Sequence, residues 1–335
     1  MSDGKRKREL ARADKVLPGV WRLRLPLPWP AVPHVNAFAI TAGSGVVLVD
    51  TGISEPGSLA QLERALDQAG LRLDHVRLLV CTHAHSDHYG LAGPIVDASG
   101  CELWMHPNHA HMTRAADDPA RAFERRIEVA RQSGVPIAAL DRYREQNKGQ
   151  GFGVERVVPP DRDLLPGVEV DTDLGRWQVH ETPGHAPSHV ILHQPDRKLM
   201  LSGDHVLGRA SLYFDYGYTP DPVGEYMSSL DRVRDLDVDL VLAGHGRPVR
   251  DLPRLVTAHE DLVEQALTRV REALADGPRT PFEIVTFVLG VQELPPAAVS
   301  WGLSLTLCYL GHLELRGEVA RVADADPERW QLTPS

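Results

Sequence analysis

Apolar residues come in short, mostly β-branched runs over the first 80 positions, and turn residues separate several of them. Four runs predict strands, at residues 20–25, 35–41, 46–50 and 76–81. Between the third and fourth runs, residues 58–70 carry Leu59, Leu62 and Leu66 at helical spacing and end on Gly70. The chain therefore begins with three strands, an amphipathic helix and a fourth strand.

A second set of strands follows a long helical stretch. Residues 91–99 predict a helix and 101–105 a strand, and residues 108–147 are mostly helical, with breaks at Pro119 and at 134–136. This stretch is too long for a simple connection, so we expect a helical insertion at about 107–150 that lies over the mouth of a site as a lid. Strands then return at 168–171, 177–181, 189–194, 198–202 and 240–243, with a helix at 223–236 before the last. Two halves that each contain a sheet predict an α+β sandwich with helices outside.

The pattern turns helical again near the C-terminus. Thr280-Pro281-Phe282-Glu283 carries a hydroxyl cap, a proline at the first helical position and a glutamate three residues after the cap. Residues 295–312 form a further helix, and residues 313–322 and 330–332 are predicted to pair as a small hairpin. We expect a tail at 1–17, a catalytic domain at 18–257 and a helical domain at 258–335, a division that suits 335 residues.

Charge and composition restrict the partners. With 36 basic and 46 acidic residues, the net charge of −10 disfavours binding to nucleic acid. The basic run at residues 5–8 is expected to be part of a solvated, disordered tail. We find no secretory signal and no apolar run long enough for a membrane helix. Cys81, Cys101 and Cys308 are odd in number and lie in apolar stretches, which favours free thiols and a cytoplasmic location.

The strongest chemical signal directly follows the strand at 76–81. Within six positions it places His83, His85, Asp87 and His88. Imidazole and carboxylate donors suit zinc, iron or manganese, and sites form where strands end. The segment therefore predicts a metal site.

Three further candidates stand beside a glycine after an apolar strand. They are His185 in Pro-Gly-His, Asp204 in Ser-Gly-Asp and His245 in Gly-His-Gly. Glycine permits a tight turn that directs the next side chain back toward a common centre. Each of these three residues is weak evidence for a metal site when taken alone. Their occurrence together with the four-residue cluster at 83–88 makes them candidate ligands.

Together with Asp50, these residues resemble the five signature motifs of the metallo-β-lactamase superfamily, over roughly residues 18–250. The resemblance implies an αββα sandwich that holds two divalent metal ions, zinc before iron or manganese. It implies that His83, His85 and His185 bind the first ion, that Asp87, His88 and His245 bind the second, and that Asp204 bridges both. Asp50 would orient the site from behind the ligands.

The chemistry follows from this ligand set. Two metals lower the pKa of a shared water and polarise the scissile bond, so a bridging hydroxide attacks without a serine or cysteine nucleophile. Asp87 is our candidate catalytic proton acceptor. Histidine at position 85 differs from the glutamate of diiron oxidoreductases, and Asp204 differs from true β-lactamases, which lack a bridging aspartate. The motifs therefore resemble those of hydrolases such as glyoxalase II.

Other polar and aromatic residues are weaker candidates. We expect His106, His109 and His111 to be surface or lid residues, and His189 and His193 to be structural. His205, Tyr213, Tyr216 and Tyr218, which lie at or after the bridging position, are candidates for the substrate pocket. The arginines of the insertion are expected to form a solvated helix face: Arg114, Arg121, Arg125, Arg126 and Arg131.

The C-terminal unit resembles, more loosely, the winged-helix domain of LACTB-like members. Some of these cleave RNA, but residues 295–312 contain no lysine or arginine to contact a phosphate backbone. We therefore interpret the unit as a packing or homodimerisation module. The main hypothesis is hydrolysis of a small ester, thioester or lactone. The alternatives are a phosphodiesterase or endoribonuclease, a persulfide dioxygenase, and a non-enzymatic metal-sensing winged-helix regulator.

Overall fold

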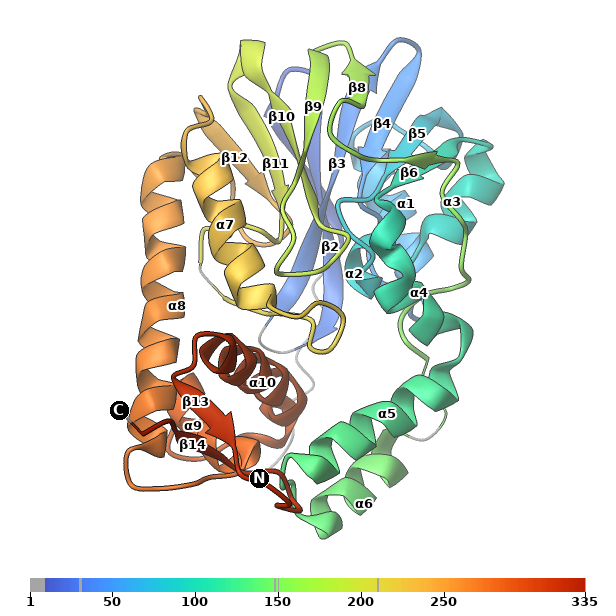
Figure 1. Cartoon of the computed structure of the whole chain (residues 1–335). Coiled ribbons are helices and arrows are strands. Elements are labelled where there is room, and N and C mark those ends of the chain that lie inside the picture. The colour runs from blue at the N-terminus through green and yellow to red at the C-terminus, as the bar shows by residue number, and fades with distance from the viewer. Residues whose placement is uncertain (1–9, 30–31, 148, 150, 210, 335) are drawn as a thin grey trace.

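The computed structural model describes residues 10–29, 32–147, 149, 151–209 and 211–334. Its core is a pair of β-sheets with helices on both outer faces (Figure 1). The first sheet has seven strands in the order β1-β2-β3-β4-β5-β6-β7 and the second has five in the order β12-β11-β10-β9-β8. The αββα sandwich expected from the sequence is thus confirmed.

The first sheet is built from the N-terminal half of the chain. Antiparallel pairing joins its first four strands, and parallel pairing joins β4 to β5, β5 to β6 and β6 to β7. The strands are β1 (Arg12–Leu17), β2 (Val20–Trp29), β3 (Val32–Ala42), β4 (Gly45–Val49), β5 (Val76–Val80), β6 (Glu102–Met105) and β7 (Arg162–Asp163).

The second sheet comes from residues 169–243. Its strands β8 to β11 are antiparallel to their neighbours, whereas β12 runs parallel to β11. The strands are β8 (Glu169–Thr172), β9 (Gly175–Glu181), β10 (Val190–Gln194), β11 (Leu199–Gly203) and β12 (Leu240–Ala243).

Three apolar layers hold the sandwich together. Side chains such as Leu62 and Ile95 pack α1 (Ser58–Gln68) and α3 (Ala92–Ser99) onto the first sheet. Phe38 and Trp177 belong to the layer between the sheets. The third layer joins the second sheet to α7 (Pro222–Arg234) and to the C-terminal helices.

The N-terminal tail is shorter than expected. Residues 12–17 were assigned to a disordered segment, but they form β1, which pairs antiparallel with β2. The backbone of Ala11 bonds to Gln61 of α1 and its side chain is buried. Pairing with the neighbouring strand β2 and the contact of Ala11 with α1 order this segment, and local composition reveals neither. The basic run at residues 5–8 lies outside the described residues.

The C-terminal unit has three helices and a hairpin, of which the sequence predicted the second and third helices and the hairpin. The helices are α8 (Leu252–Leu274), α9 (Pro281–Leu289) and α10 (Val299–Leu315), and β13 (Val319–Arg321) pairs with β14 (Trp330–Leu332). Thr280 and Glu283 form the expected capping box at the start of α9. The boundary expected at residue 257 falls inside α8, and the third apolar layer is continuous across it.

The helical insertion contains α4 (Ala110–Asp117), α5 (Pro119–Gln132) and α6 (Ile137–Asn147), with breaks at the two predicted places. Its far end packs against the C-terminal unit (Figure 1). Backbone hydrogen bonds join Phe282 to Ser133 and Glu328 to Gln132, at 3.0 and 2.8 Å. Val135 and Leu140 share an apolar cluster with Val285. The insertion is therefore anchored at a second place, away from the sheets.

Candidate metal centre

The expected ligands gather where five strands end. β4 and β5 are parallel, as are β11 and β12, and β9 runs in the same direction as β11, so their carboxyl ends meet at one edge of the sandwich. Asp50 follows β4 and the histidine cluster follows β5. His185, Asp204 and His245 follow β9, β11 and β12. Residues from both halves of the sequence thus converge on one centre.

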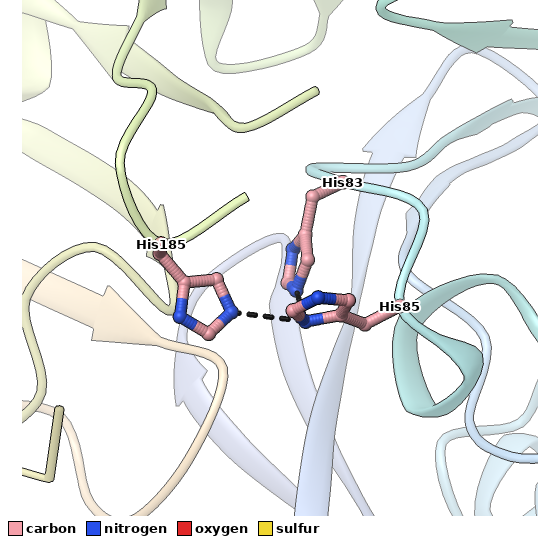
Figure 2. A group of neighbouring side chains, drawn as sticks. All are labelled: His83, His85 and His185. Atoms are coloured by element: carbon pink, nitrogen blue, oxygen red, sulfur yellow. Dashed lines mark hydrogen bonds between the residues drawn. The ribbon is translucent and has the colours of Figure 1, made fainter. Parts of the chain in front are cut away.

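His83, His85 and His185 form the first donor group. Nδ1 of His85 lies 3.1 Å from Nε2 of His83 and 3.0 Å from Nε2 of His185. Figure 2 shows His185 approaching the other two from a different segment of the chain. Nitrogens bound at about 2.0 Å to a tetrahedral zinc lie roughly 3.3 Å apart, so this spacing fits one metal ion.

Asp87, His88 and His245 form the second group, in which Asp87 and His88 come from the short helix α2 (Ser86–Tyr89). Asp87 Oδ2 lies 3.6 Å from Nε2 of His88 and 3.3 Å from Nε2 of His245. A carboxylate with two imidazoles is a donor set that suits a divalent transition metal.

Asp204 lies between the two groups. Its Oδ2 is 3.1 Å from Nε2 of His245 and 3.9 Å from Nε2 of His185, and its Oδ1 is 3.4 Å from Nε2 of His88. One carboxylate therefore reaches donors of both groups, as a bridging ligand must.

The other ring nitrogen of each histidine contacts a polar partner. Nδ1 of His185 and Nδ1 of His245 lie 3.0 and 2.9 Å from backbone oxygens of Tyr213 and His34. A carbonyl can only accept, so each of these rings donates from Nδ1 and keeps the Nε2 lone pair for a metal. The remaining pairs are His83 with Thr82, His85 with Asp215 and His88 with Asp50.

Asp50 is buried behind the ligands. Its Oδ2 lies 2.8 Å from Nδ1 of His88, and its Oδ1 accepts the backbone N–H of Thr82 at 2.8 Å. It adopts a left-handed φ of 63°, which aspartate tolerates better than most residues. The strand-to-loop turn therefore directs Asp50 toward the segment that carries the ligands.

Burial and charge act differently on the two groups. Burial lowers the pKa of His185 to about 4 and the pKa of His83 well below its usual value, so both rings are neutral and able to bind metal. Burial also opposes the charged form of His245, but Asp204 and Asp87 outweigh it and raise its pKa to about 10. The second group thus has a negative potential that attracts cations.

Polar atoms without partners also fit a metal. Nε2 of His88 and Oδ1 of Asp204 are buried and have no hydrogen-bond partner. Such atoms are costly unless something coordinates them. Both belong to the donor groups, so the residues present fit a metal pair.

Glycines make room for this arrangement. A Cβ at Gly244 would lie 2.3 Å from Oδ1 of Asp204 and 2.7 Å from Cε1 of His88. Gly184 and Gly203 have positive φ values of 123° and 48°. The glycine beside Asp204 is needed for the turn, whereas the glycine before His245 is needed for space.

The structure adds Asp215 and His111 to the site. Asp215 Oδ2 lies 3.0 Å from Nε2 of His85 and 2.8 Å from Nδ1 of His111. His106 and His111 were expected to be surface or lid residues; both are buried, so they are not surface residues, and His111 lies on α4 of the insertion. His106 contacts Glu181, and His111 contacts Asp215. An acidic residue among the aromatics at 213–218 was the available signal for Asp215.

His205, a candidate for the substrate pocket, has no exposed surface. Its ring centroid lies 5.1 Å from that of Tyr226. The apolar layer around α7 encloses its side chain, although its neighbour Asp204 faces the donor groups. His189 accepts the backbone N–H of Asp204, and His193 lies near the backbone oxygen of Asp237, which agrees with structural roles.

The three candidate tyrosines differ in position. The ring of Tyr213 lies 5.6 and 5.8 Å from the rings of His85 and His185, and the ring of Tyr218 lies 5.7 Å from that of His111. Tyr216 instead packs into the apolar clusters of the C-terminal unit. The five insertion arginines named as candidates, from Arg114 to Arg131, are exposed, as expected.

A small cavity of about 180 Å³ lies next to the centre. Pro183, Pro187 and His189 line it from the segment that holds His185, and Glu181 and Glu225 add carboxylates. The donor groups themselves are not part of its lining, so it lies behind this segment.

Comparisons with known proteins agree with this geometry. The family model of the metallo-beta-lactamase superfamily matches residues 31–245. A probable metallo-hydrolase of Bacillus subtilis, YqjP, is 27% identical over 306 residues, which cover 88% of this chain and 90% of that protein. A beta-lactamase-like protein 2 homolog of Caenorhabditis elegans is 25% identical over 262 residues, which cover 78% and 72%.

Solved structures resemble nearly the whole chain. A beta-lactamase domain protein from Burkholderia ambifaria superimposes with a TM-score of 0.83 and 29% identity, covering 96% of this chain and 94% of its own. A metallo-beta-lactamase family protein from Thermus thermophilus gives 0.81 and 26%, covering 95% and 100%. The ligand set, the sandwich and these relatives agree: the chain belongs to the metallo-β-lactamase superfamily, as a hydrolase of the kind that binds divalent metal ions.

Proposed function

We propose that this protein is a dinuclear metal-dependent hydrolase of a small ester, thioester or lactone. The observation that carries the proposal is the position of Asp204, whose two oxygens reach His245, His88 and His185. Two divalent ions, with zinc favoured by the histidine-rich donors, would supply a Lewis acid and a water acidic enough to attack near neutral pH.

The residues around the centre have distinct tasks in this proposal. Asp87 contacts His88 and His245 through Oδ2, which leaves its Oδ1 to take up a proton from the attacking water. In this proposal the ring of Tyr213, beside His85 and His185, and the ring of Tyr218, beside His111, limit the room for an acyl group. The substrate is therefore a small molecule rather than a polymer.

The features that favour a hydrolase also weigh against the alternatives. A mononuclear dioxygenase has no use for Asp87, His88 and His245, which here complete a second donor group. A sensor has no need of a bridging carboxylate. A winged-helix unit that holds RNA for cleavage would present α10 to the phosphate backbone. In this chain many residues of α10 are buried, among them Leu303, Leu307 and Leu310. The C-terminal unit is thus better suited to packing.

The compartment is part of the proposal. Cys81, Cys101 and Cys308 are free and buried, which supports a reducing environment such as the cytoplasm. No helix in the described part of the chain has the length and apolar character needed to span a membrane.

The test is a metal count combined with a substrate panel. We expect close to two ions per chain by elemental analysis, and loss of activity after treatment with chelator that returns with zinc. The panel compares p-nitrophenyl acetate, a thioester, a γ-lactone and bis-p-nitrophenyl phosphate, and we expect turnover of at least one of the first three in preference to the last. Full activity of metal-free protein, or a preference for the phosphodiester, would overturn the proposal.

A further inference from the structure

His85 is held from the side opposite the metal position by a closed set of contacts. Its Nδ1 faces the other histidines, and its Nε2 lies 3.0 Å from Oδ2 of Asp215. The same oxygen is 2.8 Å from Nδ1 of His111. Nε2 of His111 lies 2.8 Å from Oγ of Ser188, which accepts the backbone N–H of Ala84 at 3.1 Å. The contacts thus begin and end on neighbouring residues of the ligand segment.

The backbone of residues 213–215 also holds His185. The N–H of Asp215 donates to the backbone oxygen of His185 at 3.2 Å, and Nδ1 of His185 lies 3.0 Å from the backbone oxygen of Tyr213. Residues 213–215 therefore touch two of the three ligands of the first group, whose own sequence positions are 100 residues apart.

The residues that make these contacts are buried, so water cannot take the place of a lost partner. Asp215 is 7% exposed and His111 6%, so neither can replace its partner with bulk water. A buried carboxylate that accepts from a metal-binding histidine fixes the ring orientation and makes the other nitrogen a better donor. For His85 that other nitrogen is Nδ1.

We propose that Asp215 is the positioning residue for the first metal, and that His111 couples the helical insertion to it. Asp215 holds His85 with Nδ1 directed at the metal position. His111 lies on α4, so the insertion supplies part of the support for the ligand besides any role as a lid. The inference rests on the two-metal centre proposed above.

The test measures metal affinity in Asp215→Asn, which keeps the size of the side chain but removes its charge. The His245→Ala background weakens the second group, so the titration of apoprotein with Zn²⁺ against a competing chelator reports the first. We expect Asp215→Asn to lower this affinity about 10 to 100-fold, and His111→Gln to lower it less, because Asp215 still accepts from His85.

The matched control is Glu181→Gln. Glu181 contacts His106 at 2.8 Å, so it is also a carboxylate and histidine pair at the start of the insertion, but it touches no ligand. We expect its zinc affinity to equal that of the parent. Thermal unfolding of the metal-free proteins separates positioning from general stability, since positioning predicts weaker binding without a matching loss of apoprotein stability.

The outcomes distinguish this inference from the proposed function. If the parent binds no zinc, the two-metal centre itself is wrong. If the parent binds two ions and folded Asp215→Asn binds as tightly, only the positioning role is overturned. Should Asp215→Asn fail to fold, parental affinity in both His111→Gln and Ser188→Ala would overturn it.

Discussion

Nδ1 of His88 lies 2.8 Å from Oδ2 of Asp50, at the base of the second donor group. A carboxylate here holds the ring with Nε2 directed at the metal position, and it also accepts the backbone N–H of Thr82. In Asp50→Asn the amide turns an N–H₂ group toward one of these donors. We therefore expect about 10 to 100-fold weaker zinc binding at the second site, measured by titration of apoprotein against a chelator. Equal affinity of both sites in the variant and the parent would contradict this role.

Asp204→Ala is expected to weaken both metals, because its oxygens reach donors of both groups. His245→Ala should mainly weaken the second, since His245 belongs to that group alone. Elemental analysis after dialysis checks this, with a predicted content below one ion for the first variant and near one for the second. Two retained ions and full turnover in Asp204→Ala would show that the bridge is wrongly assigned.

Gly244→Ala should disrupt the centre without touching a ligand. The added Cβ would lie 2.3 Å from Oδ1 of Asp204, so the carboxylate or the strand end must move. We expect metal content and activity to fall at least tenfold. The control is Gly311→Ala, in α10, where a Cβ has nothing within 4 Å and a helical alanine adds roughly 0.5–1 kcal/mol of stability. A normal metal content in Gly244→Ala would rule out the steric argument.

Tyr218→Leu is predicted to raise KM severalfold while metal content stays near two. The ring of Tyr218 lies against His111 and beneath the guanidinium of Arg125, and His111 contacts Asp215, which holds His85. Tyr216→Phe is the matched control, because Tyr216 packs toward the C-terminal unit. Steady-state kinetics on the best substrate of the panel compare the two. A change in KM for Tyr216→Phe alone would reverse our assignment of the substrate side.

The free energy of unfolding should decrease as the pH is lowered, and the protonation of His259 should account for part of this loss. Burial lowers its pKa to about 4, and its Nε2 accepts the backbone N–H of Leu207. The unfolded chain takes up this proton near pH 6.5 and the folded chain only near pH 4, so unfolding becomes easier as pH falls between these values. The cost is on the order of 3 kcal/mol. Urea unfolding of metal-free protein should show a shallower loss in His259→Gln, and identical pH profiles would refute this account.

The sequence alone predicted the candidate metal-binding residues and the order of most elements. His83, His85, Asp87 and His88 lie within six positions after a strand, and the other ligands follow strand ends beside glycine, so local spacing carries the signal. Apolar periodicity predicted the strands of both sheets except β1 and β7, because each buries at least one apolar face. The capping box at Thr280 and the breaks in the insertion are likewise local in origin.

The tertiary structure alone decided which distant residues support these ligands. His85 and Asp215 are 130 positions apart, and only the meeting of strand ends from two sheets brings them to 3.0 Å. Pairing with β2 orders residues 12–17, although their composition resembles a tail. Asp204 and His205 are neighbours, but Asp204 faces the donor groups and His205 is buried in an apolar layer. The direction of the turn decides which of the two side chains faces the donors. Packing of these segments against other parts of the fold sets these features, and no local pattern records it.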